Sequence, residues 1–183
     1  MGKDPEVPEG DERYFEDEST AVRVFDANLL KGRLDVLPLR GPLVFSPSAT
    51  VTDAMRGMQG ERCGCVLVTE DGTPETKVVG IFTERDVLYR VVDGGRNPAT
   101  LPLAEVMTAD PACVPREASI ARALKEMAVG GFRHIPVVKE SGCPVFVVSV
   151  RDVVELLVES FPQEILNLPP RHGGDQAKER EGA

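Results

Sequence analysis

The chain repeats one arrangement of apolar and polar positions in two places. Residues 50–68 and residues 119–138 each begin with a hydroxyl residue, continue with apolar positions spaced as on one helical face, and end in an apolar run. This i, i+4, i+7 spacing is typical of an amphipathic helix, and the apolar run indicates a short buried strand. The positions with the helical spacing are Val51, Met55 and Met58 in the first stretch and Ile120, Leu124 and Met127 in the second.

The flanking residues extend this repeat. Thr50 and Ser119 stand where helix N-caps are expected. Downstream, the first copy reads VVGIF and then RDVLYRVVDG, and the second reads VFVVS and then RDVVELLVESF. Upstream, LDVLPLRGPLVFSP corresponds to LAEVMTADPACVP, which places a short extended stretch before each first helix. Each copy therefore follows the order strand–helix–strand–strand–helix.

A unit this small buries too little apolar surface to be stable by itself. We expect the two copies to pack sheet against sheet as one α/β (α+β) module with approximate twofold symmetry. The expected parts are an acidic disordered tail (1–20), a lead-in segment (21–33), the first repeat (34–94), a linker (95–102), the second repeat (103–164) and a disordered tail (165–183).

Composition excludes several classes of protein. The apolar fraction of 42% is ordinary for a globular chain, and no run approaches the roughly 18 apolar residues of a membrane helix. The first twenty residues hold eight acidic residues against two basic ones, unlike a signal peptide, so we expect a cytoplasmic protein. A net charge of −9 without a basic stripe disfavours nucleic-acid binding.

The four cysteines form no C-x-x-C pair. Cys63 and Cys65 lie two apart in a strand-like run, so we expect their side chains to share one sheet face. Zinc would require Cys113 and Cys143 to converge on them, and we expect buried apolar cysteines and no metal site.

The most specific motif is [Thr/Ser]-x-x-Asp, which occurs once in each copy between a strand and a helix. Thr83 and Asp86 form it in GIFTERDVL, and Ser149 and Asp152 form it in FVVSVRDVV. The local interpretation is a capping box with Asp at position N3. The motif also lies at a strand's carboxyl end, where ligands of α/β sheets bind, and an Arg precedes each Asp. A carboxylate for ribose hydroxyls, a guanidinium for phosphate and a helix N-terminus together predict a nucleotide site, and this role is compatible with capping.

The chain offers no catalytic constellation. It lacks a nucleophile–base–orienter set, a Walker loop and an H-E-x-x-H motif. Glu84 and Asp86 lie two apart at a helix start and diverge, so they do not form an acid–base pair. We expect no enzyme and no catalytic residues.

With GGFRHIPVV in the middle of the second copy, the duplicated unit resembles a tandem pair of cystathionine β-synthase (CBS) domains over about residues 34–161. Such pairs regulate enzymes and channels and also occur as free-standing proteins. The resemblance implies adenosine-containing ligands in two clefts between the repeats, dimerisation into a flat disc, and no required cofactor.

Carried over from the family, the ribose-binding carboxylates are Asp86 and Asp152, and their hydroxyl partners are Thr83 and Ser149. The base-lining pattern falls on residues 131–136, with a polar substitution at His134. The first copy departs from it in residues 61–66, which lack both its Gly and its Pro. The expected ligand-binding residues are Gly64, Cys65, Thr83, Arg85, Asp86, Arg133, His134, Ile135, Pro136, Ser149, Arg151 and Asp152.

A glycine expected before the second motif is replaced by Phe146, a side chain large enough to crowd a pocket. His134 is expected either to face a phosphate or to be partly buried on a backbone hydrogen bond. It alternates with Arg133, so only one of the two is expected to face the cleft. Arg85 and Arg151 are either ligand contacts or solvated first-turn residues.

The other histidine, His172, lies in the tail and is expected to be inert. Residues 20–32 carry apolar Val24, Leu29 and Leu30, which either pack on the module or contact a partner.

The function expected from these features is a sensor of AMP, ADP, ATP, S-adenosylmethionine or NAD(H) that regulates an unidentified protein. The expected protein is a homodimer that binds neither nucleic acid nor membrane. The alternative is a homodimeric scaffold without a ligand, in which both Asp residues only cap helices.

Overall fold

The computed structural model describes residues 27–37 and 39–161. The first half contains α1 (Ala27–Lys31), the 3-10 turn η2 (Leu34–Val36), β1 (Val44–Phe45), α2 (Val51–Glu61), β2 (Cys65–Thr69), β3 (Val78–Thr83), α3 (Glu84–Asp86) and its π-helical continuation η3 (Val87–Val92). The second half contains the 3-10 turn η4 (Leu103–Glu105), β4 (Thr108–Ala109), β5 (Val114–Pro115), α4 (Ile120–Gly130), β6 (His134–Val138), β7 (Pro144–Ser149) and α5 (Val150–Ser160).

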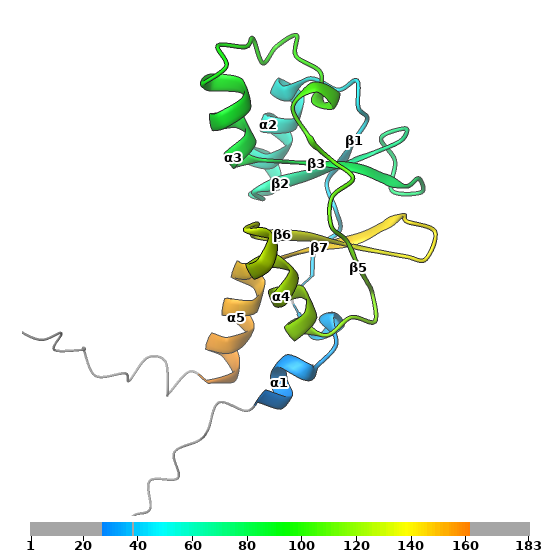
Figure 1. Ribbon diagram of the computed structural model, residues 1–183, viewed down its shortest axis with the longest axis vertical. Coiled ribbons are helices and arrows are strands. Elements are labelled where there is room, and N and C mark those ends of the chain that lie inside the picture. Colours follow the sequence, from blue (N-terminus) through cyan, green and yellow to red (C-terminus); the bar gives the residue numbers. More distant parts are fainter. Residues whose placement is uncertain (1–26, 38, 162–183) are drawn as a thin grey trace, which may run out of the picture.

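The two halves form two sheets of matching topology. The first has the order β1-β2-β3-β4 and the second has the order β5-β6-β7. In each, a two-residue strand pairs in parallel with a longer strand that is antiparallel to the next, and an irregularity follows Val68 in one sheet and Val137 in the other. Figure 1 shows one sheet above the other, with α2 and α3 beside the upper sheet and α4 and α5 beside the lower.

Apolar side chains fill the space between the sheets. Leu67 and Ile81 of the first sheet belong to a buried cluster against which Val138 and Val147 of the second sheet pack. The structure therefore confirms the predicted module of two repeats packed sheet to sheet.

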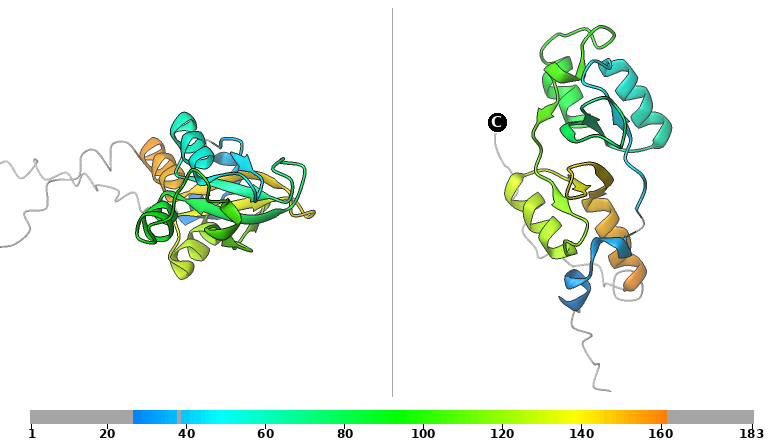
Figure 2. Two further views of the ribbon diagram at one scale, coloured as in Figure 1. Left: turned by 90° about the horizontal axis from the view of Figure 1, so that it is seen from above. Right: turned by 90° about the vertical axis from the view of Figure 1, so that its right-hand side faces the viewer.

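Each repeat completes the other's core through its opening residues, called its lead-in from here on: residues 34–43 of the first repeat and 103–112 of the second. Leu103 is fully buried among residues of the first repeat, and its backbone N–H donates to the Ala49 carbonyl at 2.9 Å. Leu34 is fully buried in the second repeat, where its N–H donates to the Ala118 carbonyl at 3.2 Å. β4 likewise extends the first sheet although it follows the first repeat in sequence. The right-hand view of Figure 2 shows both crossing segments on the outside of the sheets.

The helix starts agree with the sequence, and the buried helical face is shifted. Thr50 Oγ1 accepts the Asp53 N–H at 3.1 Å and Ser119 Oγ accepts the Arg122 N–H at 3.2 Å, so both are N-caps. The most deeply buried positions are separated by three and then four residues, because small alanines allow the helices to approach the sheets closely. They are Val51, Ala54 and Met58 in α2 and Ile120, Ala123 and Met127 in α4, while Met55 and Leu124 are half-buried.

The prediction that Cys63 and Cys65 share a face is wrong, because β2 begins only at Cys65. Cys63 packs against the first core and Cys65 lies between the sheets. Of the predicted segment 21–33, Leu30 packs against the second core, whereas Val24 lies outside the described residues. The predicted tails at residues 1–20 and 165–183 also lie outside them. Within the part that the structure describes, no helix has the length and apolarity needed to span a membrane.

The first residues of each repeat are buried in the core of the other repeat, so the two repeats should unfold together. We expect Leu103→Ala to lower the free energy of unfolding of the whole module by about 2–5 kcal/mol, in a single urea transition. Val36→Ala is the control, since Val36 is 54% exposed and its truncation should change stability by less than about 0.5 kcal/mol. Two separated transitions in Leu103→Ala would contradict the interlocked arrangement.

Candidate functional site

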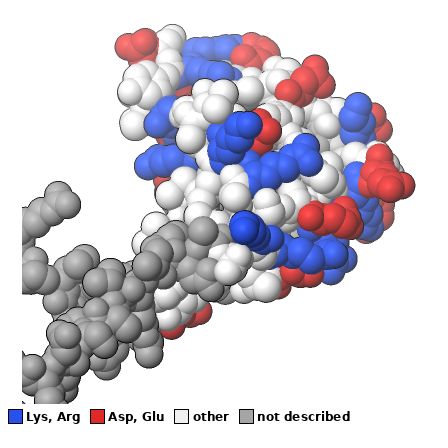
Figure 3. Space-filling view, turned by 60° about the horizontal axis from the view of Figure 1, so that its bottom comes forward, with Lys and Arg blue, Asp and Glu red and all other residues white. Residues whose placement is uncertain are grey.

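A cleft of about 350 Å³ lies between the repeats. Its wall combines the end of β3 and the start of α3 with Thr108, residues 110–112, residues 130–134 and Pro136, so both repeats contribute. The sequence-predicted site residues that line it are Gly64, Thr83, Arg85, Asp86, Arg133, His134 and Pro136. On the face of the molecule drawn in Figure 3, basic and acidic side chains are intermingled around neutral surface.

Thr83 and Asp86 form a complete capping box at the mouth of this cleft. Asp86 Oδ2 accepts the Thr83 N–H at 2.9 Å and the Thr83 hydroxyl at 2.7 Å, and Thr83 Oγ1 faces the Asp86 N–H at 3.4 Å. The carboxylate, which is mostly buried, is thus fixed at the positive end of a helix. The predicted cap is present, and the same carboxylate lines the cleft.

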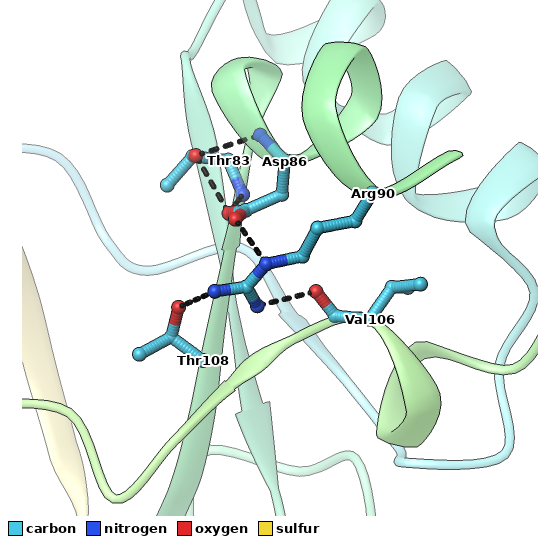
Figure 4. A network of polar contacts seen from close by, with 5 residues as sticks. All are labelled: Thr83, Asp86, Arg90, Val106 and Thr108. Carbon is cyan, nitrogen blue, oxygen red and sulfur yellow. Dashed lines mark hydrogen bonds and ion pairs between the residues drawn. The ribbon is translucent and has the colours of Figure 1, made fainter. Parts of the chain in front are cut away.

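Arg90 forms an ion pair with the other oxygen of this carboxylate, Oδ1 (Figure 4). Its Nε lies 3.2 Å from Asp86 Oδ1, its Nη1 donates to the Val106 carbonyl at 2.7 Å and its Nη2 donates to Thr108 Oγ1 at 3.1 Å. The guanidinium therefore joins the first repeat's last helix to the lead-in of the second repeat.

The second motif forms the same box in different surroundings. Asp152 Oδ2 accepts the Ser149 N–H at 2.7 Å and its hydroxyl at 2.8 Å. Arg151 is 81% exposed and its Nε pairs with Glu155 Oε1 at 2.8 Å, as expected of a solvated first-turn residue. Ser149, Arg151 and Asp152 do not line the cleft described above.

Basic side chains from both repeats lie around the cleft. Arg85 Nη1 donates to the Gly131 carbonyl at 3.3 Å and so crosses from one repeat to the other. β6 begins at His134, so Arg133 is not part of the strand alternation, and both residues line the cleft. The prediction that only one of them faces it is wrong.

His134 is half-buried and lies near acidic and basic groups. The pKa of His134 is below its ordinary value because burial disfavours the charged ring and Arg133 repels it, although Asp152 and Glu84 act in the opposite direction. The ring is therefore neutral at pH 7, with one nitrogen able to donate and the other able to accept a hydrogen bond.

Three other residues named from the sequence lie behind the cleft wall. Ile135 is fully buried in the second core, Cys65 is buried between the sheets, and neither lines the cleft. Burial raises the pKa of Cys65 to about 12, which leaves it a thiol. Phe146 is directed into the second core and does not crowd the described cleft. Among residues 27–37 and 39–161, no three His, Cys, Asp or Glu side chains are grouped to hold a metal ion.

The sequence interpretation missed Arg90 and the segment 108–112. Arg90 follows Asp86 by four residues, a spacing that places side chains on one helical face, so this signal was available. Nothing in the repeat pattern indicates that residues 108–112 lie against the first repeat's motif, because that contact depends on the crossing of the lead-in.

Comparison with known proteins identifies close relatives of this architecture. The family model described as CBS domain matches the chain twice, over residues 34–93 and 103–159. The CBS domain-containing protein CBSX3, mitochondrial, of Arabidopsis thaliana is 32% identical over 121 residues, which cover 65% of this chain and 58% of that protein. The chain thus matches less than two thirds of that relative's length.

Solved structures of similar proteins share the fold. A CBS domain protein from Pyrobaculum aerophilum complexed with AMP is 25% identical, with a TM-score of 0.62 over 70% of this chain and 99% of that chain. An uncharacterized conserved protein from Pyrococcus horikoshii is also 25% identical, with a TM-score of 0.61 over 70% of this chain and 93% of that chain.

The lowered pKa of His134 predicts a pH dependence of stability. The unfolded chain binds the proton more readily than the folded one, so stability present above pH 6.5 is lost as the pH falls through the folded-state pKa. We expect His134→Gln to flatten the free energy of unfolding between about pH 7 and pH 5, measured by urea titration. His172→Gln should leave the wild-type slope unchanged, and an unchanged slope in His134→Gln would contradict the assignment.

Proposed function

The chain belongs to the CBS domain family. From that membership and from the geometry of the cleft, we propose that it is a non-catalytic regulatory module. In this proposal an adenosine-containing ligand binds between its repeats. The observation that carries the proposal is the position of the Thr83–Asp86 box in a cleft to which both repeats contribute. The similar Pyrobaculum protein complexed with AMP supports AMP as the first ligand to test. ADP, ATP, S-adenosylmethionine and NAD(H) remain in the proposed class, and no cofactor is required.

The cleft has the chemistry that such a ligand needs. Asp86 Oδ1 faces one cation and a carboxylate oxygen accepts more than one hydrogen bond, so it has capacity for a ribose hydroxyl. Arg85 and Arg133 supply guanidinium groups, which match phosphate oxygens. Ile81 and Pro136 offer apolar surface for a purine ring.

Regulation would follow from the shared wall. A ligand that touches both repeats stabilises the relative placement of the repeats in which it fits best, by its difference in affinity for the alternatives. Arg85 already reaches the Gly131 carbonyl of the other repeat, so the ligand would replace or reinforce an existing contact. A regulated protein partner would respond to that change.

The ligand-free scaffold remains the second candidate because one observation favours it. Both Asp86 oxygens already have partners within the protein, as a purely structural capping residue would.

Asp86→Ala separates the two candidates, with Asp53→Ala as a matched control. Asp53 forms an equivalent capping box with Thr50 at the start of α2 and does not line the cleft. Asp86→Ala should lower the free energy of unfolding by about 0.5–2 kcal/mol, and Asp53→Ala should lower it by less because Asp53 is exposed. Only Asp86→Ala should weaken AMP binding, by about tenfold or more in titration calorimetry. Equal AMP affinity in both variants would refute the contact between Asp86 and the ribose. If the wild type bound no adenosine compound, the ligand-free scaffold would be the remaining candidate function.

We also propose a homodimer formed through exposed apolar helix surfaces. Leu88, Tyr89 and Val92 of η3 are 62%, 69% and 66% exposed, and Val154 and Val158 of α5 are also exposed. Exposed apolar side chains grouped on a helix mark an interaction site, and a twofold contact would bury them against an identical copy.

Sedimentation of a Leu88→Glu, Tyr89→Glu variant tests the dimer. We expect the wild type to sediment as a dimer and the variant as a monomer, because two charges would be buried without partners. Val36→Glu changes an exposed apolar residue of η2 and should leave the wild-type assembly intact. A monomeric wild type would exclude the dimer.

The cellular location stays a prediction. The sequence suggests the cytoplasm, while the name of the Arabidopsis relative places that protein in the mitochondrion.

A further inference from the structure

The capping boxes of Thr83–Asp86 and Ser149–Asp152 have the same hydrogen-bond pattern. They differ in the residue that faces the second carboxylate oxygen. In the first box Asp86 Oδ1 faces Arg90, four residues further along the helix. Four residues after Asp152 the chain has Leu156, which packs against the second core. The cation is thus specific to the first box.

The lead-in residues differ in the same way. Thr108 accepts a hydrogen bond from Arg90. Counting from the paired Leu34 and Leu103, the residue that corresponds to Thr108 is Leu39, which also packs against the second core. A polar pair in one half of the module is therefore replaced by two leucines in the other.

Arg90 is fixed in place and still has hydrogen-bond capacity. A guanidinium carries five N–H donors. In the described structure one Nη1 N–H donates to Val106, one Nη2 N–H donates to Thr108 and Nε faces Asp86, which leaves one N–H on each Nη nitrogen. The side chain is 42% exposed and lines the cleft.

This placement suits an anion on the sugar that Asp86 binds. A nucleotide that donates its ribose hydroxyls to Asp86 carries its phosphate on C5′ of the same sugar, and the guanidinium fork matches phosphate oxygens. Arg85 and Arg133 are exposed, and among the described residues the guanidinium of Arg85 donates only to the Gly131 carbonyl. Because Arg90 is already ordered by three contacts, less side-chain entropy is lost when it binds a phosphate.

We propose that Arg90 is the residue that makes this cleft select 5′-phosphorylated adenosine over adenosine, and that the second box, with Leu156 and Leu39, lacks this selectivity. The proposal rests on the proposed function and assigns the source of its ligand specificity.

The test is the ratio of AMP affinity to adenosine affinity, measured by titration calorimetry on the full chain and on the Asp152→Asn chain, in which the second box has lost its charge. Arg90→Leu copies the residue of the second repeat. Arg96→Leu is the matched control, because Arg96 also pairs with the lead-in, through Glu105, and does not line the cleft.

We expect the wild type and Arg96→Leu to prefer AMP, and Arg90→Leu to lose about tenfold to a hundredfold in AMP affinity with adenosine affinity nearly unchanged. Arg90→Gln, which keeps a donor for Val106 and removes the charge, should show the same loss and guards against a folding defect in the leucine variant.

An equal loss for both ligands in the two Arg90 variants would make Arg90 a structural residue only and overturn the inference. A wild type that binds AMP no tighter than adenosine would overturn it as well, with the proposed function intact. A wild type that binds neither compound would overturn the proposed function itself.

Discussion

The structure depends on the exchange of lead-in segments between its halves. Leu34 enters the second core and Leu103 enters the first, and both are fully removed from water. Burial of a leucine contributes about 1.5–3 kcal/mol, a large share of the stability available to so small a unit. The exchange also brings Thr108 and residues 110–112 to the wall of the cleft that holds the first repeat's motif.

In the capping boxes of Thr83–Asp86 and Ser149–Asp152, the hydroxyl and carboxylate that cap the helix are also the groups proposed to bind a ligand. A carboxylate at position N3 accepts the backbone N–H of the N-cap residue and interacts favourably with the helix dipole, which together hold the group oriented. A ligand would meet a side chain that requires no reordering on binding. The hydroxyl and carboxylate can therefore be required for the helix and available to a ligand at once, and presence of the motif does not by itself distinguish the two roles.

Features set by local sequence were predictable, and those set by the crossing of the chain were not. Thr50, Ser119 and the two boxes act within four residues, so spacing was enough to identify them. The order of helices and strands along each copy followed from the repeat, whereas the addition of β4 to the first sheet did not. The buried position of Ala54 in place of Met55 depends on how closely α2 approaches its sheet, and the start of β6 at His134 decides that Arg133 also lines the cleft. The contacts of Arg90 with Val106 and Thr108 join segments 16 and 18 residues apart, and no periodicity encodes them.

The lengths of the outer strands have a consequence for how copies of the chain meet in solution. β1 and β4 at the edges of the first sheet, and β5 at one edge of the second, are two residues long. Such edges expose too few unpaired N–H and C=O groups to recruit a strand from another molecule. The longer edge strand, β7, begins with Pro144, which has no N–H to donate. The apolar strands β2 and β3 are enclosed within their sheet, so the first sheet presents only two-residue edges to another copy of the chain.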